Sequence, residues 1–195
     1  MQNILELSKQ NQRRAYEVIE ESGVFSAWQS IGAEVQIVGS LRMGLLMKHR
    51  DIDLQIYTDP LIISESFSVI SKLAENPAFK EVIYRNMISP TEDYLEWHAY
   101  YLDKNNALWQ LDMIHFLKGS KYYGYFENVA DRIKAVLTEE TKNTILRLKY
   151  ETPENEKILG LEYYQAVIKD NVQTYQDFTE WRKNHNIDEI ATWVP

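Results

Sequence analysis

Four residues in the first third of the chain have the types and the spacing of a phosphate-transfer site. Gly39 and Ser40 directly follow one strand-like run, and Asp51 and Asp53 begin a second. Because side chains alternate between the faces of a strand, the two aspartates share one face. Like charges about 4 Å apart repel by about 4 kcal/mol at an intermediate dielectric, so this pair needs a cation. Glycine lets backbone N–H groups approach an anion, and the four residues together predict attack on a nucleoside triphosphate.

A strand, Gly-Ser, a ten-residue spacer and Asp-apolar-Asp-apolar resemble the signature of the DNA polymerase beta-like nucleotidyltransferase superfamily. The resemblance implies a third carboxylate on a later strand. Asp112, set in an otherwise apolar run, is the best candidate, with Asp103 and Glu96 as fallback candidates. By the same resemblance Asp51 and Asp53 each hold a metal ion, while Asp112 binds one ion and helps to activate the attacking hydroxyl.

The residues that contact the triphosphate are less closely specified. Many members of the superfamily close the helical turn after Gly-Ser with Arg-Gly, but here the basic residue lies two places before Gly44 rather than next to it. The loop between the two halves of the motif is locally basic. Its basic residues are Arg42, Lys48, His49 and Arg50. We therefore predict that Arg42 and Lys48 assist Gly39 and Ser40 in binding the nucleotide.

The surrounding pattern predicts an α+β protein in which a nucleotidyltransferase-like mixed β-sheet is packed by helices and followed by a C-terminal helical bundle. Apolar and β-rich runs predict strands over 35–38, 51–57, 82–84, 94–102 and 107–116, the last two joined as a hairpin. Helical periodicity predicts helices over 3–22, 25–31 and 60–75, and helices alone from residue 127 onward. This divides the chain into a core over 1–126 and a helical region over 127–195.

Local helix starts are predicted from N-cap residues, whose side chains accept hydrogen bonds from the first free backbone N–H groups. The predicted starts are Asn3 with Glu6, Asp59 before Pro60, Thr152 before Pro153, and Thr174 with Asp177. An acidic residue or a proline in the first turn strengthens each of them.

Aromatic and histidine side chains outside the motif are predicted mainly to be structural. Four aromatic residues crowd one segment, namely Tyr122, Tyr123, Tyr125 and Phe126. They favour anchoring of a loop to the core, with stacking on a nucleobase as the alternative. His98 and His115 lie on the two hairpin strands, and alternation turns His115 away from Asp112, which argues against a shared metal site.

Composition limits the partners. The chain has 195 residues, is 45% hydrophobic and carries a formal charge of −8, which argues against sequence-independent binding to nucleic acid. The absence of cysteine removes disulfides, thiol nucleophiles and cysteine-type zinc sites. The first residues lack the basic and apolar regions of a signal peptide, and no apolar run reaches membrane-spanning length, so cytoplasmic residence is the default expectation.

These observations predict a transferase that uses one or two Mg²⁺ ions to move a nucleoside monophosphate from a nucleoside triphosphate to a hydroxyl, releasing pyrophosphate. A small-molecule acceptor is favoured, a protein hydroxyl is the second enzymatic possibility, and no stable nucleic acid or membrane partner is expected. The alternative from another class is a non-catalytic, regulatory or antitoxin-like binding module of the same fold. A protein partner or a homodimer stays open in either case.

Overall fold

The computed structural model describes residues 4–185 and 193–195, and five of its segments are strands of one sheet. The strands are β1 (Glu34–Ile37), β2 (Asp51–Thr58), β3 (Phe79–Asn86), β4 (Tyr94–Leu102) and β5 (Leu108–Leu117). Their order across the sheet is β1-β2-β5-β4-β3. Strands β2 and β5 are parallel, and every other neighbouring pair is antiparallel, so the sheet is mixed as predicted.

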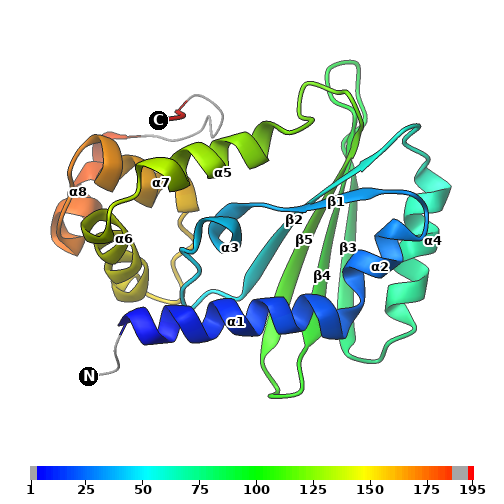
Figure 1. Cartoon of the computed structure of the whole chain (residues 1–195), viewed down its shortest axis with the longest axis horizontal. Helices are drawn as coiled ribbons and strands as arrows, with labels where there is room; N and C mark the ends of the chain where they lie inside the picture. Colours follow the sequence, from blue (N-terminus) through cyan, green and yellow to red (C-terminus); the bar gives the residue numbers. More distant parts are fainter. Residues whose placement is uncertain (1–3, 186–192) are drawn as a thin grey trace.

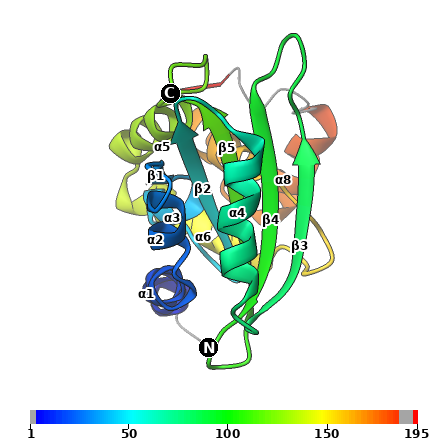
Figure 2. The same cartoon turned by 90° about the vertical axis from the view of Figure 1, so that its right-hand side faces the viewer.

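Helices cover both faces of this sheet. They are α1 (Ile4–Ser22), α2 (Val24–Gln29), α3 (Gly39–Met43), α4 (Ile63–Ala74), α5 (Tyr125–Val136), α6 (Glu139–Glu151), α7 (Gly160–Tyr164) and α8 (Tyr175–Asn184), with a π-helical turn η1 (Gln165–Lys169) after α7. Figure 1 shows α2 and α4 beyond one face of the sheet and α5 to α8 beyond the other. In the turned view of Figure 2, α4 lies in front of the central strands.

A first core fills the space between the sheet and helices α1, α2 and α4. It forms because β4 and β5 alternate, with Trp97, Leu111 and Met113 turned inward and the residues between them half-buried. The opposite face of the same strands carries polar side chains. The alternation therefore gathers polar side chains of β4 and β5 on the face opposite the first core.

A second core joins the C-terminal helices to the segment between α3 and β2. Its buried residues include Leu45 and Met47 from that segment and Phe178 from α8. Helix α1 contacts both cores and fixes the segment, because the Ser8 hydroxyl donates to the carbonyl of Leu46 at 2.7 Å. This clamp positions the chain immediately before β2, where the predicted aspartates lie.

The strand predictions are confirmed, with β4 at its predicted bounds and β3 longer than its predicted core at both ends. The predicted cap at Thr174 is confirmed too, because its side chain accepts a hydrogen bond from the backbone N–H of Asp177. The predicted cap at Asn3 lies outside the described residues. Where several independent local signals agree, the elements form as expected.

Two predicted helix starts are wrong. Asp59 and Pro60 form a bend with a cis peptide bond, and α4 begins only at Ile63. Thr152 ends α6 as its C-cap instead of starting the next helix, which begins at Gly160. In both places a proline follows the end of an element, and proline is as common just after an element as in the first turn of a helix.

Within the described residues, none of the helices combines the length and the apolar character that crossing a bilayer requires.

Candidate active site

The three predicted carboxylates lie on one face of two adjacent parallel strands. Asp53 of β2 is directly opposite Asp112 of β5 in the strand register, and Asp51 is opposite Gln110. Directly paired residues of neighbouring strands point to the same face, so all three acids emerge on the face turned away from the first core. Asp51 is exposed, whereas Asp53 and Asp112 are half-buried.

The Gly39–Ser40 turn packs directly on Asp53. Gly39 has a φ of 60°, and a Cβ built on it would lie 1.9 Å from Oδ2 of Asp53, which is far inside contact distance. The backbone of the turn is held there because the N–H of Val38 donates to the carbonyl of Asp53 at 3.0 Å. Only glycine fits between this turn and the carboxylate, which explains the glycine of the motif.

The acids repel one another and are poorly solvated. Burial, then the charges of Asp112 and Asp51, raise the pKa of Asp53 to about 7. Asp51 is reached by solvent at the mouth of the site, but the protein around it and the charge of Asp112 raise its pKa as well. A proton therefore competes with any cation for Asp53 near neutral pH.

Two neighbouring side chains hold Asp112, one from the paired strand and one from its own strand. His98 of β4 is the direct partner of Asp112, and its Nδ1 lies 2.5 Å from Oδ1 of the carboxylate. The Gln110 amide donates to the same carboxylate at 2.8 Å. On its other side, Nε2 of His98 lies 3.5 Å from Glu96 and is buried without a hydrogen-bond partner among the described residues. Asp112 is thus positioned from one side by a histidine and an amide.

A buried lysine from the C-terminal helices completes the Gly-Ser turn. Lys149 of α6 is only 9% exposed, and its Nζ donates to the Ser40 hydroxyl at 2.8 Å and to the carbonyl of Leu45 at 3.1 Å. The same Nζ lies 3.0 Å from the Tyr164 hydroxyl, which is itself 2.9 Å from the hydroxyl of Ser40. No carboxylate is paired with Lys149 among the described residues, so its charge faces the acids of the site.

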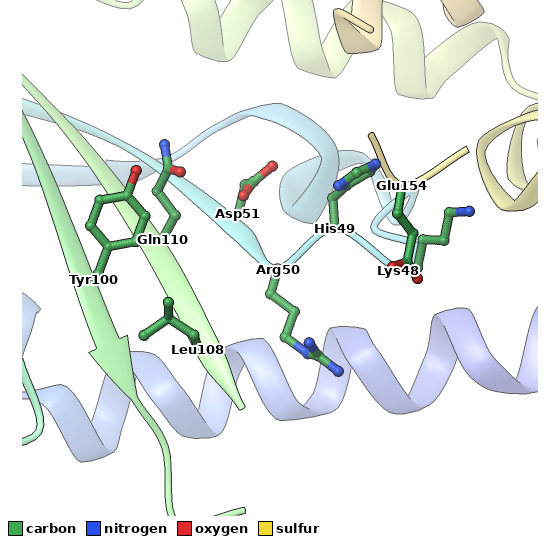
Figure 3. A pocket seen from close by; sticks show the side chains of 8 residues that line it. All are labelled: Lys48, His49, Arg50, Asp51, Tyr100, Leu108, Gln110 and Glu154. Atoms are coloured by element: carbon green, nitrogen blue, oxygen red, sulfur yellow. The ribbon is translucent and has the colours of Figure 1, made fainter. Parts of the chain in front are cut away.

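Two cavities open at these acids. The inner cavity has a volume of about 490 Å³ and is lined by the three acids, Ser40 and Lys149, together with Lys157 and Tyr163. The outer cavity has a volume of about 300 Å³ and meets the inner one at Asp51. Figure 3 shows Asp51 and Gln110 on one side of the strands that frame the outer cavity, while Arg50 extends away from them toward α1.

The structure places the predicted basic residues Arg42 and Lys48 in other contacts. Arg42 forms a two-pronged ion pair with Asp131 of α5, at 2.8 and 2.7 Å, and so ties α3 to α5. Lys48 donates through Nζ to the backbone carbonyl of Tyr150, at 2.9 Å, and to that of Thr152 at the end of α6. Lys48 still borders the outer cavity, but the cation nearest to Ser40 is Lys149.

The fallback acids Asp103 and Glu96 and the second histidine, His115, make other contacts. Asp103 is buried in the β4–β5 loop, where it is paired with Arg14 at 2.8 Å and bonded to the indole of Trp109. His115 points into the first core as alternation predicted, lies 2.7 Å from the hydroxyl of Thr58, and has its pKa lowered to about 4 by burial. Of the two fallback acids, Glu96 is the one near Asp112, through His98.

The donor set suits Mg²⁺ in its chemistry, because three carboxylates on adjacent strands offer only oxygen ligands and leave room for water and phosphate. After burial, the charges of Asp112 and Asp51 contribute to the raised pKa of Asp53, and a cation would offset this repulsion. Within residues 4–185 and 193–195, however, no three acidic or histidine side chains are arranged to hold an ion as they stand. The three acids fit the ion by residue type and strand position, and His98 and Gln110 already contact the carboxylate of Asp112.

The sequence matches no protein-family model and no curated protein. Its fold is similar to solved structures of nucleotidyltransferases. A cytoplasmic RNA terminal U-transferase matches with a TM-score of 0.50 at 16% identity over 82% of this chain and 53% of its own. The Cid1 poly(U) polymerase with MgGTP bound matches with a TM-score of 0.51 at 17% identity, over 82% of this chain and 55% of its own.

The GLD-2/RNP-8 complex matches with a TM-score of 0.57 at 8% identity, over 96% of this chain and 72% of that one. Cid1 and GLD-2 belong to the DNA polymerase beta-like nucleotidyltransferase superfamily. The chain spans about half the length of the U-transferase and Cid1 structures. At these identities the comparison shows the fold alone, and it confirms at that level the resemblance indicated by Gly39, Ser40, Asp51 and Asp53.

Sequence analysis did not assign three residues to the site, namely Lys149, Tyr164 and His98. Lys149 and Tyr164 lie in helices whose packing against α3 has no local signature. The pairing of His98 with Asp112 was predictable, because a hairpin that pairs Leu102 with Leu108 also pairs His98 with Asp112. Interpreting the hairpin by register, as well as by alternation, would have identified it.

Proposed function

We propose that this protein transfers a nucleoside monophosphate from a nucleoside triphosphate to a hydroxyl, with Mg²⁺ and with release of pyrophosphate. The observation that carries the proposal is the direct pairing of Asp53 with Asp112 across β2 and β5, beneath a Gly39 whose missing side chain leaves room for the Asp53 carboxylate. The matching fold of known nucleotidyltransferases supports it. When bound, the metal would neutralise the carboxylates of Asp51, Asp53 and Asp112 and polarise the phosphate.

Residues of the chain bind the phosphates and accept the proton. The Ser40 hydroxyl and the Lys149 ammonium hold the phosphates, because both lie at one end of the inner cavity and Lys149 is already directed at Ser40. Asp112, fixed by His98, accepts the proton of the attacking hydroxyl. The hydroxyl oxygen bonds to the α-phosphorus, and the bond from this phosphorus to the pyrophosphate oxygen breaks. The electron pair of the broken bond leaves with pyrophosphate.

We propose a small molecule as the acceptor. The inner cavity has the volume of a small-ligand site, and the chain carries a net charge of −8, which disfavours neutralising many phosphates of a polynucleotide. The compared structures point the other way, since one is named as an RNA terminal U-transferase. RNA is therefore the second arm of the test, and a hydroxyl of a protein is the third.

The test is label transfer from each of the four nucleoside triphosphates, labelled at the α-phosphate, in the presence of Mg²⁺. The acceptors are a pool of small hydroxyl compounds, an RNA oligonucleotide and the protein alone. Asp53→Asn should abolish transfer, whereas Asp93→Asn, an exposed carboxylate outside the cavities, should leave it unchanged. Transfer that survives Asp53→Asn would contradict the proposed site.

The same experiment separates the enzyme from a binding module of the same fold. A module predicts no labelled product with any acceptor and association with a protein partner that Asp53→Asn leaves intact. Labelled RNA as the sole product would keep the nucleotidyl transfer and overturn the small-molecule acceptor.

A further inference from the structure

A third cavity, the apolar groove, begins at the same Gly39–Ser40 turn but runs in another direction. It has a volume of about 290 Å³ and lies between β2 and the helices α3, α5 and α7. Its walls are mainly apolar and include Val38, Met43, Phe126, Val129, Ile133 and Leu161. Figure 1 shows α5 passing above α3.

Gln55 is an unexplained polar residue in this groove. It lies two places after Asp53 on β2, is only 5% exposed, and lines the groove, yet its Oε1 has no hydrogen-bond partner in the part of the chain that the structure describes. Leaving a buried amide oxygen unpaired is unfavourable, and folded proteins rarely do so without a ligand or water to fill the place. Gln55 therefore brings an unpaired acceptor to the wall of the groove, and because Oε1 itself is enclosed, the amide must rotate to meet an N–H group of a ligand.

The two cavities beside Ser40 divide the chemistry of a nucleotide between them. The inner cavity is lined by the three acids and by Lys149 and Lys157, which suits phosphates and an acceptor. The apolar groove has mainly apolar walls and one amide, which suits an aromatic heterocycle with a polar edge. Ser40 and Asp53 line both cavities, so a single ligand can lie across them.

Phe126 gives the groove a rigid aromatic wall. Its ring stacks on Phe116 at 6.1 Å and on Tyr122 at 5.9 Å, with interplanar angles of 27° and 21°. Tyr122 and Tyr123 are instead anchored by hydrogen bonds to Glu92 and Glu34. Among these aromatic residues, Phe126 is the one that lines the groove.

We infer that the apolar groove holds the base of the nucleoside triphosphate and that the Gln55 amide accepts a hydrogen bond from an N–H group of that base. Gln55 is then a specificity-determining residue. The inference rests on the proposed function, and it adds the place where the nucleotide is selected. The amide is neutral, so it selects by hydrogen bonding and shape and not by charge.

The test is equilibrium binding by calorimetry, with Mg²⁺ and without acceptor, of ATP, GTP, CTP, UTP and tripolyphosphate. Gln55→Met keeps the length of the side chain and removes its hydrogen bonds. It should weaken binding of the preferred nucleotide by about tenfold and reduce the differences among the four, while tripolyphosphate binding stays unchanged. An analogue of the preferred nucleotide with a methyl group in place of the N–H proton should lose affinity for the wild type but not for Gln55→Met.

Gln36→Met is the matched control. Gln36 is the direct partner of Gln55 across β1 and β2, so it lies on the same face, but its amide donates to Glu34 at 3.1 Å. This variant should bind all four nucleotides as the wild type does. Val129→Trp, which fills the groove from α5, should weaken all four nucleotides and spare tripolyphosphate.

Two outcomes overturn different claims. Equal affinities of wild type and Gln55→Met for every nucleotide would show that the amide does not contact the base and binds water instead, which overturns this inference and leaves the proposed function standing. Failure of the wild type to bind any nucleotide or tripolyphosphate would overturn the proposed function itself.

Discussion

At the scale of single residues, the Asp53 carboxylate occupies the space that a side chain on Gly39 would need. Gly39→Ala is therefore a direct test of the site. The new Cβ would lie 1.9 Å from the Asp53 carboxylate and would sit at a φ of 60° that disfavours alanine. We expect transfer to fall by about a hundredfold because the carboxylate must move by an ångström or more. Stability should fall by about 1 kcal/mol from backbone strain.

Gly119→Ala is the control for backbone strain alone. Gly119 has a φ of 84°, and nothing lies within 4 Å of its would-be Cβ. Thermal unfolding should show a similar loss of stability in both variants, while label transfer should be lost in Gly39→Ala only. Equal transfer by the two variants would mean that the contact with Asp53 has no part in the reaction.

The raised pKa of Asp53 predicts how stability depends on pH in the absence of divalent ions. The folded protein holds the proton of Asp53 up to a pKa of about 7, whereas the unfolded chain releases it near 3.8. The folded state thus binds more protons in this interval, and stability must fall as pH rises through it. The buried His115 acts in the opposite direction below about pH 6.5, because burial lowers its pKa to about 4 in the folded state. We therefore expect the melting temperature of the wild type, relative to that of Asp53→Asn, to drop by several degrees between about pH 5 and about pH 8.

Asp53→Asn should lose the contribution of Asp53, because an amide has no proton to release in this range, and should keep the rise in stability that His115 produces. The chosen window lies above the range in which Glu21 titrates, whose pKa is lowered to about 2 by Arg14 and Lys104. Mg²⁺ should oppose the drop in the wild type by replacing the proton. An unchanged slope in Asp53→Asn would assign the pH dependence to other groups.

The residues found from the sequence and those missed differ in how locally they are specified. Asp51, Asp53 and the Gly-Ser turn belong to one continuous segment, so spacing and alternation were sufficient. Lys149 is specified by tertiary contacts alone, since a lysine on an amphipathic helix is ordinarily solvated. Gln55 was missed because an amide in an apolar strand carries no signal until its missing partner is seen.

At the scale of elements, α6 supplies the charge that the predicted loop residues do not. We expect Lys149→Met to weaken nucleotide binding by about tenfold or more, because the inner cavity loses the cation bonded to Ser40. Folding should persist with a moderate loss of stability, because methionine fills the space of the lysine stem but leaves the carbonyl of Leu45 without this donor. Calorimetry with Mg²⁺-nucleotide and a thermal melt measure the two effects separately.

Lys142→Met on the same helix is the control, because Lys142 does not line the described cavities. Its nucleotide affinity should match that of the wild type. If Lys149→Met and Lys142→Met bind nucleotide equally well, Lys149 is a structural lysine only.

Helices and strands were predictable where two sequence signals agreed. Their boundaries were ambiguous where proline was the only signal. The β4–β5 hairpin combined alternation with a polar loop and was predicted to within a residue. Pro60 and Pro153 each mark a boundary, but proline does not say whether an element ends before it or begins at it. Tertiary packing decided both cases in favour of an ending, which leaves 152–159 as a connection that borders the inner cavity.

At the scale of the whole molecule, the inner cavity lies between the two cores and draws its lining from both. Asp51 and Asp112 come from the sheet, whereas Lys149 and Tyr163 come from the C-terminal helices. A ligand in this cavity therefore contacts both halves of the fold and binds the folded state only. A mixed sheet was predicted, but the particular parallel pairing of β2 with β5 was not predictable from local patterns, because parallel neighbours are distant in sequence.

A ligand that binds only the folded state raises the melting temperature, and this shift can be measured. A Mg²⁺-nucleoside triphosphate at about 100 times its dissociation constant should add about 2.7 kcal/mol to the free energy of unfolding, which is about 5 to 10 °C in melting temperature for a chain of this size. Mg²⁺ alone should give a smaller shift, because it lacks the phosphate oxygens that complete its ligands and the described acids do not form a ready-made ion site. Asp51→Asn combined with Asp53→Asn should abolish the nucleotide-dependent shift, while Asp93→Asn retains it. A melting temperature that none of the four Mg²⁺-nucleotides changes would mean that the cavity between the cores is not a nucleotide site.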